Sequence, residues 1–202
     1  MSKKAIIIFV KYPELGRSKT RLAASVGKQN ALKVYKELLH HTNLITKNIK
    51  SDKYLFYDKF SENKLPWGDD IYLTAYQKES DLGGRMQNAF EQVFAKGYER
   101  AVIIGSDCYD LTQTIIEDAL NTLDTTDVVI GPAKDGGYYL LGLTRIIPEL
   151  FTNVAWSTED VFSSTVKVLK DLNIAYQIGP TLSDIDTIDD LPEALKSILD
   201  PY

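Results

Sequence analysis

The sequence predicts a single-domain α/β sandwich, and three observations support this fold class. Apolar segments rich in β-branched residues alternate with segments of helical periodicity along the chain, the pattern of sheets covered by helices. No repeat, low-complexity tract or linker rich in Gly and Ser interrupts the alternation. The chain has 202 residues, a length that suits one domain. We therefore expect one domain over residues 1–202.

The first half of the chain predicts three strands and two helices. Residues 5–10 (AIIIFV) form an unbroken apolar run, typical of a strand buried on both faces of a parallel sheet. Residues 29–49 place Tyr35 and other apolar side chains at helical spacing. The remaining elements expected here are strands at 53–57 and 71–76 and a helix from Met86 to a stop at Gly97.

The second half is more regular. Strand 101–105, helix 115–123 and strand 127–131 form a βαβ unit, which usually closes right-handed onto a parallel sheet. A helix at 157–172 opens with Ser157 and Asp160, close to a capping box. The other elements expected are strands at 138–143 and 175–179 and a last helix at 189–199, with Pro192 in its first turn.

Composition narrows the class of protein. The net charge of −5 and the pI of about 5.1 argue against a nucleic-acid binder, and no apolar run approaches the roughly 20 residues that span a membrane. Cys108 is the single cysteine, which excludes an internal disulfide and suits a reducing compartment. We expect a cytoplasmic protein that binds neither nucleic acid nor membrane; the sequence does not predict the oligomeric state.

The segment KYPELGRSKTRL, residues 11–22, is a candidate phosphate site. It gathers Lys11, Arg17, Lys19 and Arg21 around Gly16, directly after the first predicted strand. A loop with a glycine that enters a helix N-terminus, with added Lys and Arg, holds phosphate oxygens well. Neither a Walker A motif nor a dinucleotide fingerprint is present. The alternative is a solvated basic loop.

Two acidic segments are candidates for a Mg²⁺ or Mn²⁺ site. Asp107 lies just beyond the strand at 101–105, where a carboxylate suits a hard cation, and we assign the capping of the next helix to Asp110. In the segment 182–191, Asp184 and Asp186 alternate and so share one face of an extended chain. We choose Asp186 as the second metal ligand.

The segment 131–137 (GPAKDGG) lies between two predicted strands. Its adjacent glycines, Gly136 and Gly137, allow either close approach of the backbone to a ligand or simply a hairpin turn. Asp135 would extend from this turn beside the same sheet edge as Asp107. Cations and a metal site on one edge together indicate a nucleotide polyphosphate.

Five motifs resemble the bacterial glycosyltransferase-A-like family, which includes uncharacterised members and arsenosugar-biosynthesis glycosyltransferases. They are K-x-P-x-x-G-x-x-K-T-R-L (11–22), D-L-G-G-R-M (81–86), G-S-D-C-Y-D-L (105–111), G-P-A-K-D-G-G-Y-Y-L-L-G-L (131–143) and D-I-D-T (184–187). The K-T-R-L loop is also similar to that of the phospholactate guanylyltransferases, and more distantly the chain resembles sugar-phosphate nucleotidyltransferases. Two positions depart from the family pattern: Tyr109 replaces a proline and Gly84 replaces a glutamate.

The resemblance implies a nucleotide-diphospho-sugar transferase fold, a Rossmann-like three-layer sandwich around a mostly parallel sheet. It also implies roles for individual residues. The implied nucleotide and phosphate contacts are Lys11, Gly16, Lys19, Arg21 and Arg85, the metal ligands Asp107 and Asp186, and the acceptor contacts Gly136, Gly137 and Tyr138. Asp135, with Lys19 and Arg21, would be catalytic. Trp156 is as consistent with a pocket wall as with core packing.

Three functions fit these features. The first is transfer of a glycosyl group from a nucleotide-diphosphate sugar to a small acceptor, assisted by Mg²⁺ or Mn²⁺. The second joins a nucleoside triphosphate to a sugar phosphate or phosphorylated acid and releases pyrophosphate. The third is a nucleotide-binding protein without catalysis. Pyrophosphate release distinguishes the second function from the first.

Overall fold

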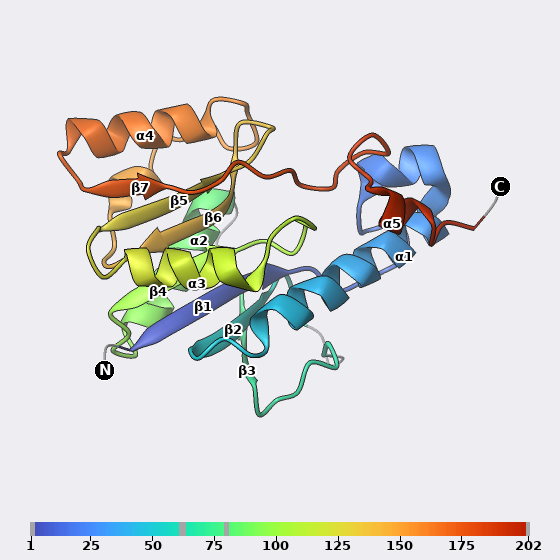
Figure 1. Ribbon diagram of the computed structural model, residues 1–202, viewed down its shortest axis with the longest axis horizontal. Coiled ribbons are helices and arrows are strands. Elements are labelled where there is room, and N and C mark those ends of the chain that lie inside the picture. Colours follow the sequence, from blue (N-terminus) through green and yellow to red (C-terminus); the bar gives the residue numbers. More distant parts are fainter. Residues whose placement is uncertain (1–2, 61–63, 79–80, 201–202) are drawn as a thin grey trace.

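The computed structural model describes residues 3–60, 64–78 and 81–200. The strands in these ranges are β1 (Lys4–Val10), β2 (Asp52–Tyr57), β3 (Tyr72–Tyr76), β4 (Arg100–Ile104), β5 (Val128–Pro132), β6 (Tyr138–Leu143) and β7 (Tyr176–Ile178). They form one sheet in the order β3-β2-β1-β4-β6-β5-β7 (Figure 1). Only β6 runs antiparallel to its neighbours within the described residues, which confirms the predicted mostly parallel α/β fold.

Helices cover both faces of the sheet. They are α1 (Thr20–Thr46), α2 (Leu82–Phe94), α3 (Gln113–Thr122), α4 (Val161–Asp171), the short α5 (Glu193–Lys196) and the 3₁₀ turn η1 (Pro148–Leu150). Apolar side chains of α1 and α3 pack on one face of the sheet, and those of α2 and α4 pack on the other. The result is the predicted three-layer sandwich, with one pair of helices on each face of the sheet.

The strand β6 lies between β4 and β5 and is antiparallel to both. The unit β4-α3-β5 therefore has two parallel strands, as predicted, but they are not adjacent. The turn between β5 and β6 is a hairpin, the turn geometry that the sequence allowed for this segment. Because β6 begins where β4 and β5 end, the hairpin turn lies at the carboxyl edge of the parallel strands.

Helix α1 begins at Thr20, nine residues before the start expected from the sequence. Gly27, with a φ of 78°, breaks it into two helical segments, and a glycine accepts this left-handed conformation without a Cβ clash. The short segment before Gly27 lacks a long amphipathic stripe, which explains why periodicity alone missed it. Its buried residues, Leu22 and Val26, face a separate small core.

Three predictions about helix ends are wrong. Thr112, not Asp110, caps α3, since its Oγ1 accepts a bond from the Ile115 amide at 3.3 Å. Ser157 has a φ of 66° and lies outside α4, which begins at Val161 and has no side-chain cap. The last helix covers only Glu193–Lys196, because the residues before Pro192 form a turn instead. In that turn the Asp190 carboxylate accepts bonds from the Asp186 and Thr187 amides.

A second, smaller core joins the two ends of the chain. Leu22 and Val26 of α1 pack against Ile185, Leu191 and Leu195. In Figure 1 the C-terminal segment leaves β7, crosses the carboxyl edge of the sheet and meets the first part of α1. This packing brings the basic loop and the acidic segment of residues 184–190 together.

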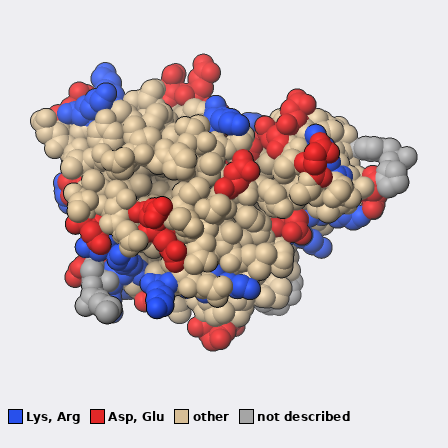
Figure 2. All heavy atoms as spheres, viewed as in Figure 1, with Lys and Arg blue, Asp and Glu red and all other residues tan. Residues whose placement is uncertain are grey.

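The surface carries charge of both signs. On the face in Figure 2, Lys and Arg side chains are interspersed with Asp and Glu side chains. Among the described residues, no helix has both the length and the apolar character needed to cross a membrane. A further group of charged side chains lines a cavity at the carboxyl edge of the sheet.

Candidate active site

A cavity of about 570 Å³ opens at the carboxyl ends of β1 and β4. The first turns of α2, the hairpin turn, and the segments 156–159 and 184–186 complete its walls. An adjoining hollow of about 240 Å³ is lined by the basic loop, and the two share Lys11, Arg21, Tyr35, Asp107 and Asp186. Open α/β sheets bind ligands at this edge.

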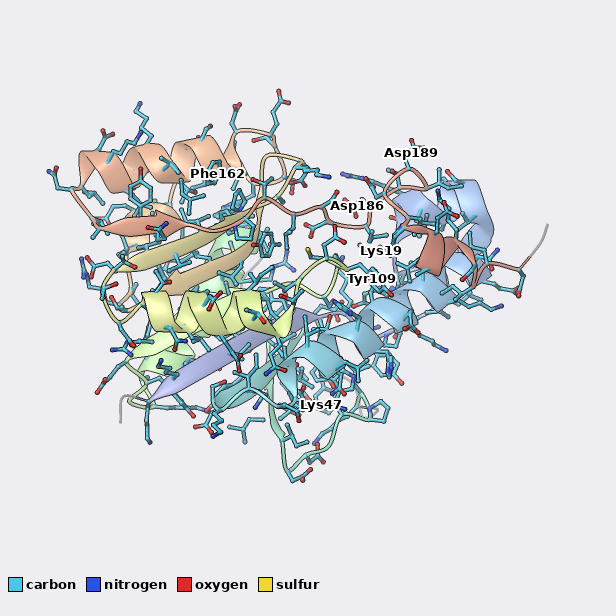
Figure 3. All side chains as sticks on the ribbon, in the orientation of Figure 1. Lys19, Lys47, Tyr109, Phe162, Asp186 and Asp189 are labelled. Carbon is cyan, nitrogen blue, oxygen red and sulfur yellow. The ribbon has the colours of Figure 1, made fainter. Side chains whose placement is uncertain are left out.

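The charged end of the cavity is where the basic loop meets the acidic segments. Lys19 Nζ lies 3.0 Å from Asp107 Oδ1 and 3.4 Å from Asp186 Oδ1. The Lys19 side chain is only 5% exposed, whereas Arg21, whose guanidinium lies 3.3 Å from Asp186, is largely exposed. Figure 3 shows Lys19 and Asp186 close together although they come from segments far apart in the sequence. The structure thus brings together four residues that the sequence singled out, namely Lys19, Arg21, Asp107 and Asp186.

The backbone of the basic loop aims Lys19 into this site. Gly16 and Lys19 both have positive φ, 75° and 51°, and Lys19 is the residue that precedes α1. A left-handed conformation costs a residue with a Cβ about 1–2 kcal/mol, and such strain often accompanies a functional site. Ser18 Oγ is buried without a hydrogen-bond partner in the described protein and lines the smaller hollow. An anion oxygen would satisfy this unpaired donor.

Tyr35 of α1 fixes the ends of two strands. Its hydroxyl accepts a bond from the Lys11 amide and donates to the Lys11 carbonyl, both at 2.9 Å, and lies 3.5 Å from Ser106 Oγ. Burial, and then the nearby Asp107 carboxylate, raise the pKa of Tyr35, so it stays protonated. The sequence placed Tyr35 on a helix face but gave no sign of this role.

Asp184 is an acid of the cavity wall to which the sequence analysis assigned no role. It lines the cavity beside Asp107 and Asp135. Burial and the carboxylates of Asp107 and Asp135 raise the pKa of Asp184 to about 7. Alternation along the chain brought Asp184 into consideration, but spacing alone could not tell which acid is buried. A cation placed among these carboxylates would relieve their mutual repulsion.

The donor chemistry of the charged end fits a hard divalent ion. Asp107 and Asp186 offer carboxylate oxygens, the ligands that Mg²⁺ and Mn²⁺ prefer in combination with substrate phosphates. Both carboxylates already share one cation, the Lys19 ammonium group. No group of three or more His, Cys, Asp or Glu side chains arranged around one point occurs in the described part of the chain. Asp107 and Asp186 could therefore supply two carboxylate ligands, and phosphate oxygens would have to supply the others.

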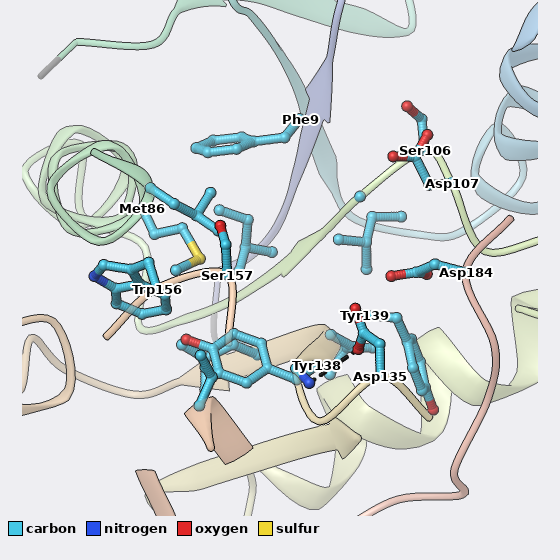
Figure 4. A pocket seen from close by; sticks show the side chains of 18 of the residues that line it. Phe9, Met86, Ser106, Asp107, Asp135, Tyr138, Tyr139, Trp156, Ser157 and Asp184 are labelled. Carbon is cyan, nitrogen blue, oxygen red and sulfur yellow. Dashed lines mark hydrogen bonds between the residues drawn. The ribbon is translucent and has the colours of Figure 1, made fainter. Parts of the chain in front are cut away.

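The hairpin turn forms the floor between the two ends of the cavity. The Gly137 amide donates to Asp135 Oδ1 at 2.9 Å, which holds this carboxylate at the cavity edge (Figure 4). Gly136 has a φ of 88°, and a Cβ there would lie closer than 3.0 Å to the Glu159 backbone. Asp135 and Gly137 line the cavity, whereas Gly136 packs against its wall. Gly16 likewise shapes a loop without lining the cavity.

The aromatic end of the cavity consists of Phe9, Met86, Tyr138 and Trp156, on the side opposite the acids in Figure 4. The rings of Tyr138 and Trp156 meet nearly edge to face, with centroids 6.4 Å apart. The Tyr138 hydroxyl is buried and lacks a partner among the described residues. Trp156 thus lines the cavity and also packs against the core.

Arg85 and the two positions that depart from the family pattern lie near these walls. The Arg85 guanidinium donates to the Asp81 carbonyl at 3.1 Å and to Gln77 Oε1 at 3.4 Å. The Gly84 amide donates to Asp81 Oδ1 at 2.8 Å, in the first turn of α2. Tyr109 packs on His41 with a centroid distance of 4.8 Å, and the turn still presents Asp107 to the cavity.

The fold is that of the nucleotide-diphospho-sugar transferase class. Within that class, the chain belongs to the family described as uncharacterized proteins conserved in bacteria (DUF2064), whose sequence profile matches residues 42–158. A comparison with curated proteins finds no match.

Solved structures support this placement. A candidate nucleotide-diphospho-sugar transferase from Desulfovibrio desulfuricans G20 is 33% identical, with a TM-score of 0.85 over 93% of this chain and 84% of that one. An inositol-1-phosphate CTP transferase from T. maritima, 13% identical, has a TM-score of 0.54 and covers 98% of this chain and 95% of its own. Glucosyl-3-phosphoglycerate synthase from Mycobacterium tuberculosis, solved with Mn²⁺ and UDP, is 8% identical with a TM-score of 0.51, over 91% of this chain and 71% of that chain. The last two similarities show the fold alone.

Proposed function

We propose that the protein is a metal-assisted transferase that takes a nucleotide-diphosphate sugar and glycosylates a small acceptor. The observation that carries the proposal is the contact of Lys19 with Asp107 and Asp186 at the carboxyl edge of the sheet. The D. desulfuricans relative, which this chain matches over most of its length, supports it. The motifs shared with arsenosugar-biosynthesis glycosyltransferases point the same way, and we expect this single domain to act in the cytoplasm.

Lys11, Lys19 and Arg21 would bind the diphosphate. These cations line the smaller hollow together with the unpaired Ser18 hydroxyl. Hydrogen bonds between charged partners are roughly twice as strong as neutral ones, and cations placed before the reaction stabilise charge as it develops on a leaving group. Gly16 would allow the loop backbone to turn around the phosphates, and Arg85 would contact the nucleotide from α2.

Asp107 and Asp186 would hold Mg²⁺ or Mn²⁺. When bound, the ion supplies charge that stabilises the departing nucleoside diphosphate. The M. tuberculosis synthase, solved with Mn²⁺ and UDP, provides a precedent on a related fold. Asp184 lies near enough to both acids to add to the negative potential that attracts the ion.

Asp135 would orient or deprotonate the acceptor hydroxyl. One of its oxygens accepts the Gly137 amide, so the carboxylate is held in place while its other oxygen can bind the acceptor. Gly137 and Tyr138 lie beside it on the cavity wall, and Gly136 fixes the turn. These positions support our assignment of the hairpin to the acceptor side of the site.

Nucleotidyl transfer is a second candidate function, favoured by the form of the basic loop. Two left-handed residues, Gly16 and Lys19, wrap the loop before the first turn of α1, a shape suited to a longer phosphate chain. The K-T-R-L motif resembles the phospholactate guanylyltransferases, and the T. maritima CTP transferase has a related fold. This reaction would use the same cations and the same metal ligands.

A product assay separates the candidates. Purified protein with Mn²⁺ is mixed with nucleotide sugars and acceptor alcohols, or with nucleoside triphosphates and sugar phosphates, and the released phosphates are separated. Nucleoside diphosphate release that depends on acceptor supports glycosyl transfer, whereas pyrophosphate release supports the second function. Asp107→Asn should abolish either product, and Lys36→Met, on the exposed side of α1, should not. Nucleotide binding with neither product would leave a binding protein without catalysis.

A further inference from the structure

A lysine already pairs with both acids that we propose as metal ligands. The Lys19 ammonium lies 3.0 Å from Asp107 Oδ1 and 3.4 Å from Asp186 Oδ1, and its side chain is nearly fully covered (Figure 3). Asp186 has a second cation at its other oxygen, since Arg21 lies 3.3 Å from Asp186 Oδ2. Lys19 is also one of the cations that we assign to the diphosphate. One side chain therefore has two sets of proposed partners, the acids and the phosphates.

A divalent ion on these acids would compete with the Lys19 ammonium. Mg²⁺ binds carboxylate oxygens at about 2 Å, closer than the ammonium approaches them. Asp107 has one oxygen without an ion pair among the described residues, but both oxygens of Asp186 face a protein cation. An ion shared by the two acids would therefore repel at least one of these cations at short range, and repulsion is strongest for a charge that solvent does not screen.

Either ligand alone would leave charges unpaired. A divalent ion without phosphate would separate the covered Lys19 ammonium from its two carboxylates, and a covered charge without a partner is costly. A diphosphate without the ion would draw Lys19 away from the acids and add negative charge to a cavity that Asp135 and Asp184 also line. With both ligands present every charge has a partner, because the ion takes the acids and the ammonium takes a phosphate oxygen.

The smaller hollow gives the Lys19 side chain room to change partners. This hollow of about 240 Å³ is lined by Lys19, Lys11 and Arg21 together with Asp107 and Asp186. The lysine ammonium stands on a flexible four-carbon stem, so a change of rotamer can move it while the backbone stays in place. The acids and the proposed phosphate site thus lie within reach of one side chain.

We infer that Lys19 exchanges partners when the substrate binds. In the structure its ammonium pairs with Asp107 and Asp186; it leaves these acids when they take a divalent ion, and it then binds a phosphate of the nucleotide. The ion and the nucleotide consequently bind as a coupled pair, and each raises the affinity of the site for the other. This inference rests on the proposed binding of an ion and a diphosphate, and it holds for glycosyl and for nucleotidyl transfer alike.

Binding of Mn²⁺ without nucleotide tests the first half of the exchange. Electron paramagnetic resonance of the unbound ion gives the Mn²⁺ affinity of the wild type and of each variant. Lys19→Met removes the competing cation and should bind Mn²⁺ about tenfold more tightly, although it binds nucleotide less well. Arg21→Met should gain less, because Arg21 is largely exposed and its ion pair is weak. Lys11→Met removes a cation of the same hollow that has no ion pair with either acid among the described contacts, so it measures the effect of nearby charge alone.

Chemical labelling of lysines in the wild-type protein tests both halves of the exchange and does not depend on the folding of any variant. Reductive methylation followed by mass spectrometry compares the reactivity of Lys19 with that of Lys36, an exposed residue of α1. Lys19 should be protected in EDTA, should react several-fold faster at saturating Mn²⁺, and should be protected again when UDP, GDP, CDP or ADP is added with Mn²⁺. Lys36 should react equally in all three conditions.

The outcomes separate this inference from the proposed function. A larger gain in Mn²⁺ affinity for Lys19→Met than for Lys11→Met, together with faster labelling of Lys19 in Mn²⁺, supports the exchange. Equal affinities in these two variants, or labelling of Lys19 that Mn²⁺ does not change, would overturn the exchange; if Asp107→Asn still loses Mn²⁺ binding, the metal site of the proposed function stands. Wild-type Mn²⁺ binding by Asp107→Asn would reject that metal site, and the exchange with it.

Discussion

The two ends of the cavity differ in how far the protein satisfies its own polar groups. At the charged end, Lys19 is paired with two carboxylates and almost fully covered. At the aromatic end, the Tyr138 hydroxyl is covered but unpaired. The first end is internally neutralised and must exchange partners to bind a ligand, whereas the second end keeps one buried hydroxyl that the described protein leaves unpaired.

This difference predicts opposite responses to mutation. Removing the Lys19 cation from the charged end leaves two carboxylates without their shared partner, so both stability and phosphate binding should suffer. Removing the unpaired Tyr138 hydroxyl from the aromatic end should not cost stability. The variants below test this contrast in order of the expected effect on the free energy of unfolding.

The largest effect should come from Gly136→Ala, because this glycine joins the two ends. Its φ of 88° strains any other residue, and the added Cβ would overlap the Glu159 backbone. We expect a loss of about 2–4 kcal/mol in the free energy of unfolding, measured with urea. Gly97→Ala is the matched control: its φ of 82° imposes similar strain, but nothing lies within 4 Å of the new Cβ. Equal losses in the two variants would show that the contact with Glu159 does not matter.

Lys19→Met tests the charged end. It leaves Asp107 and Asp186 without their shared cation, but both acids are nearly half exposed, which limits the loss of stability to about 1–2 kcal/mol. Nucleotide affinity should fall at least tenfold in calorimetric titrations with Mn²⁺, because a phosphate contact is lost. Lys36→Met removes the same charge from an exposed site on α1 and should change neither quantity. Wild-type affinity in Lys19→Met would place the phosphates elsewhere.

Asp184→Asn tests the pH dependence of the same end. The pKa of about 7 for Asp184 lies above that of an unfolded aspartate, so its ionisation disfavours the folded state as pH rises from about 4 to 7. The variant should match the wild type near pH 4 and be more stable by about 2 kcal/mol at pH 8, in EDTA, roughly half of what the full pKa shift corresponds to, because Asp184 is partly exposed and solvent screens its charge. The carboxylates of Asp107 and Asp135 and the Lys19 ammonium surround this group.

Asp189→Asn, an exposed acid in the same segment, is the control for this comparison and should change stability little at either pH. If Asp184→Asn is no more stable than the wild type at pH 8, the charge of Asp184 does not oppose folding.

The smallest change in stability should be that of Tyr138→Phe. Since the hydroxyl has no partner, its loss should leave the midpoint of thermal unfolding unchanged or slightly higher. The neighbouring Tyr139 hydroxyl donates to the Pro180 carbonyl at 2.9 Å, so Tyr139→Phe should lose about 1 kcal/mol. A lower unfolding midpoint for Tyr138→Phe would mean that the Tyr138 hydroxyl already makes a hydrogen bond in the folded protein.

The charged end could be anticipated from the sequence because its chemistry shows in local patterns. Lys19 and Arg21 follow the buried strand β1 and the glycine after it, and Asp107 follows the buried strand β4. All three residues therefore lie at the carboxyl edge of the parallel strands. The spacing could not show which side chains are buried or paired. From the sequence we chose Asp186 as the second metal ligand and gave Asp184 no role, and nothing showed that Lys19 pairs with Asp107 and Asp186. The burial and the pairing of these side chains depend on the small core that Leu22 forms with Ile185, a contact between segments far apart in the sequence.

The aromatic end could be predicted only in part. Tyr138 and Trp156 were candidates for the cavity wall, but Phe9 and Met86 occupy a strand and a helix position where apolar residues normally serve the core. Only packing in three dimensions decides that their side chains line a cavity. The same reason explains the hairpin: insertion of β6 between β4 and β5 is a property of the whole sheet and not of residues 131–137.

The central claim is that the charged end binds the phosphates of a nucleotide together with a divalent ion. Calorimetric titration of UDP, GDP, CDP and ADP into the protein, with Mn²⁺ and with EDTA, tests it most directly. We expect saturable binding of at least one diphosphate that requires Mn²⁺ and is lost in Asp107→Asn, while Lys36→Met binds like the wild type. Absence of binding for every diphosphate, or equal binding by wild type and Asp107→Asn, would contradict the account.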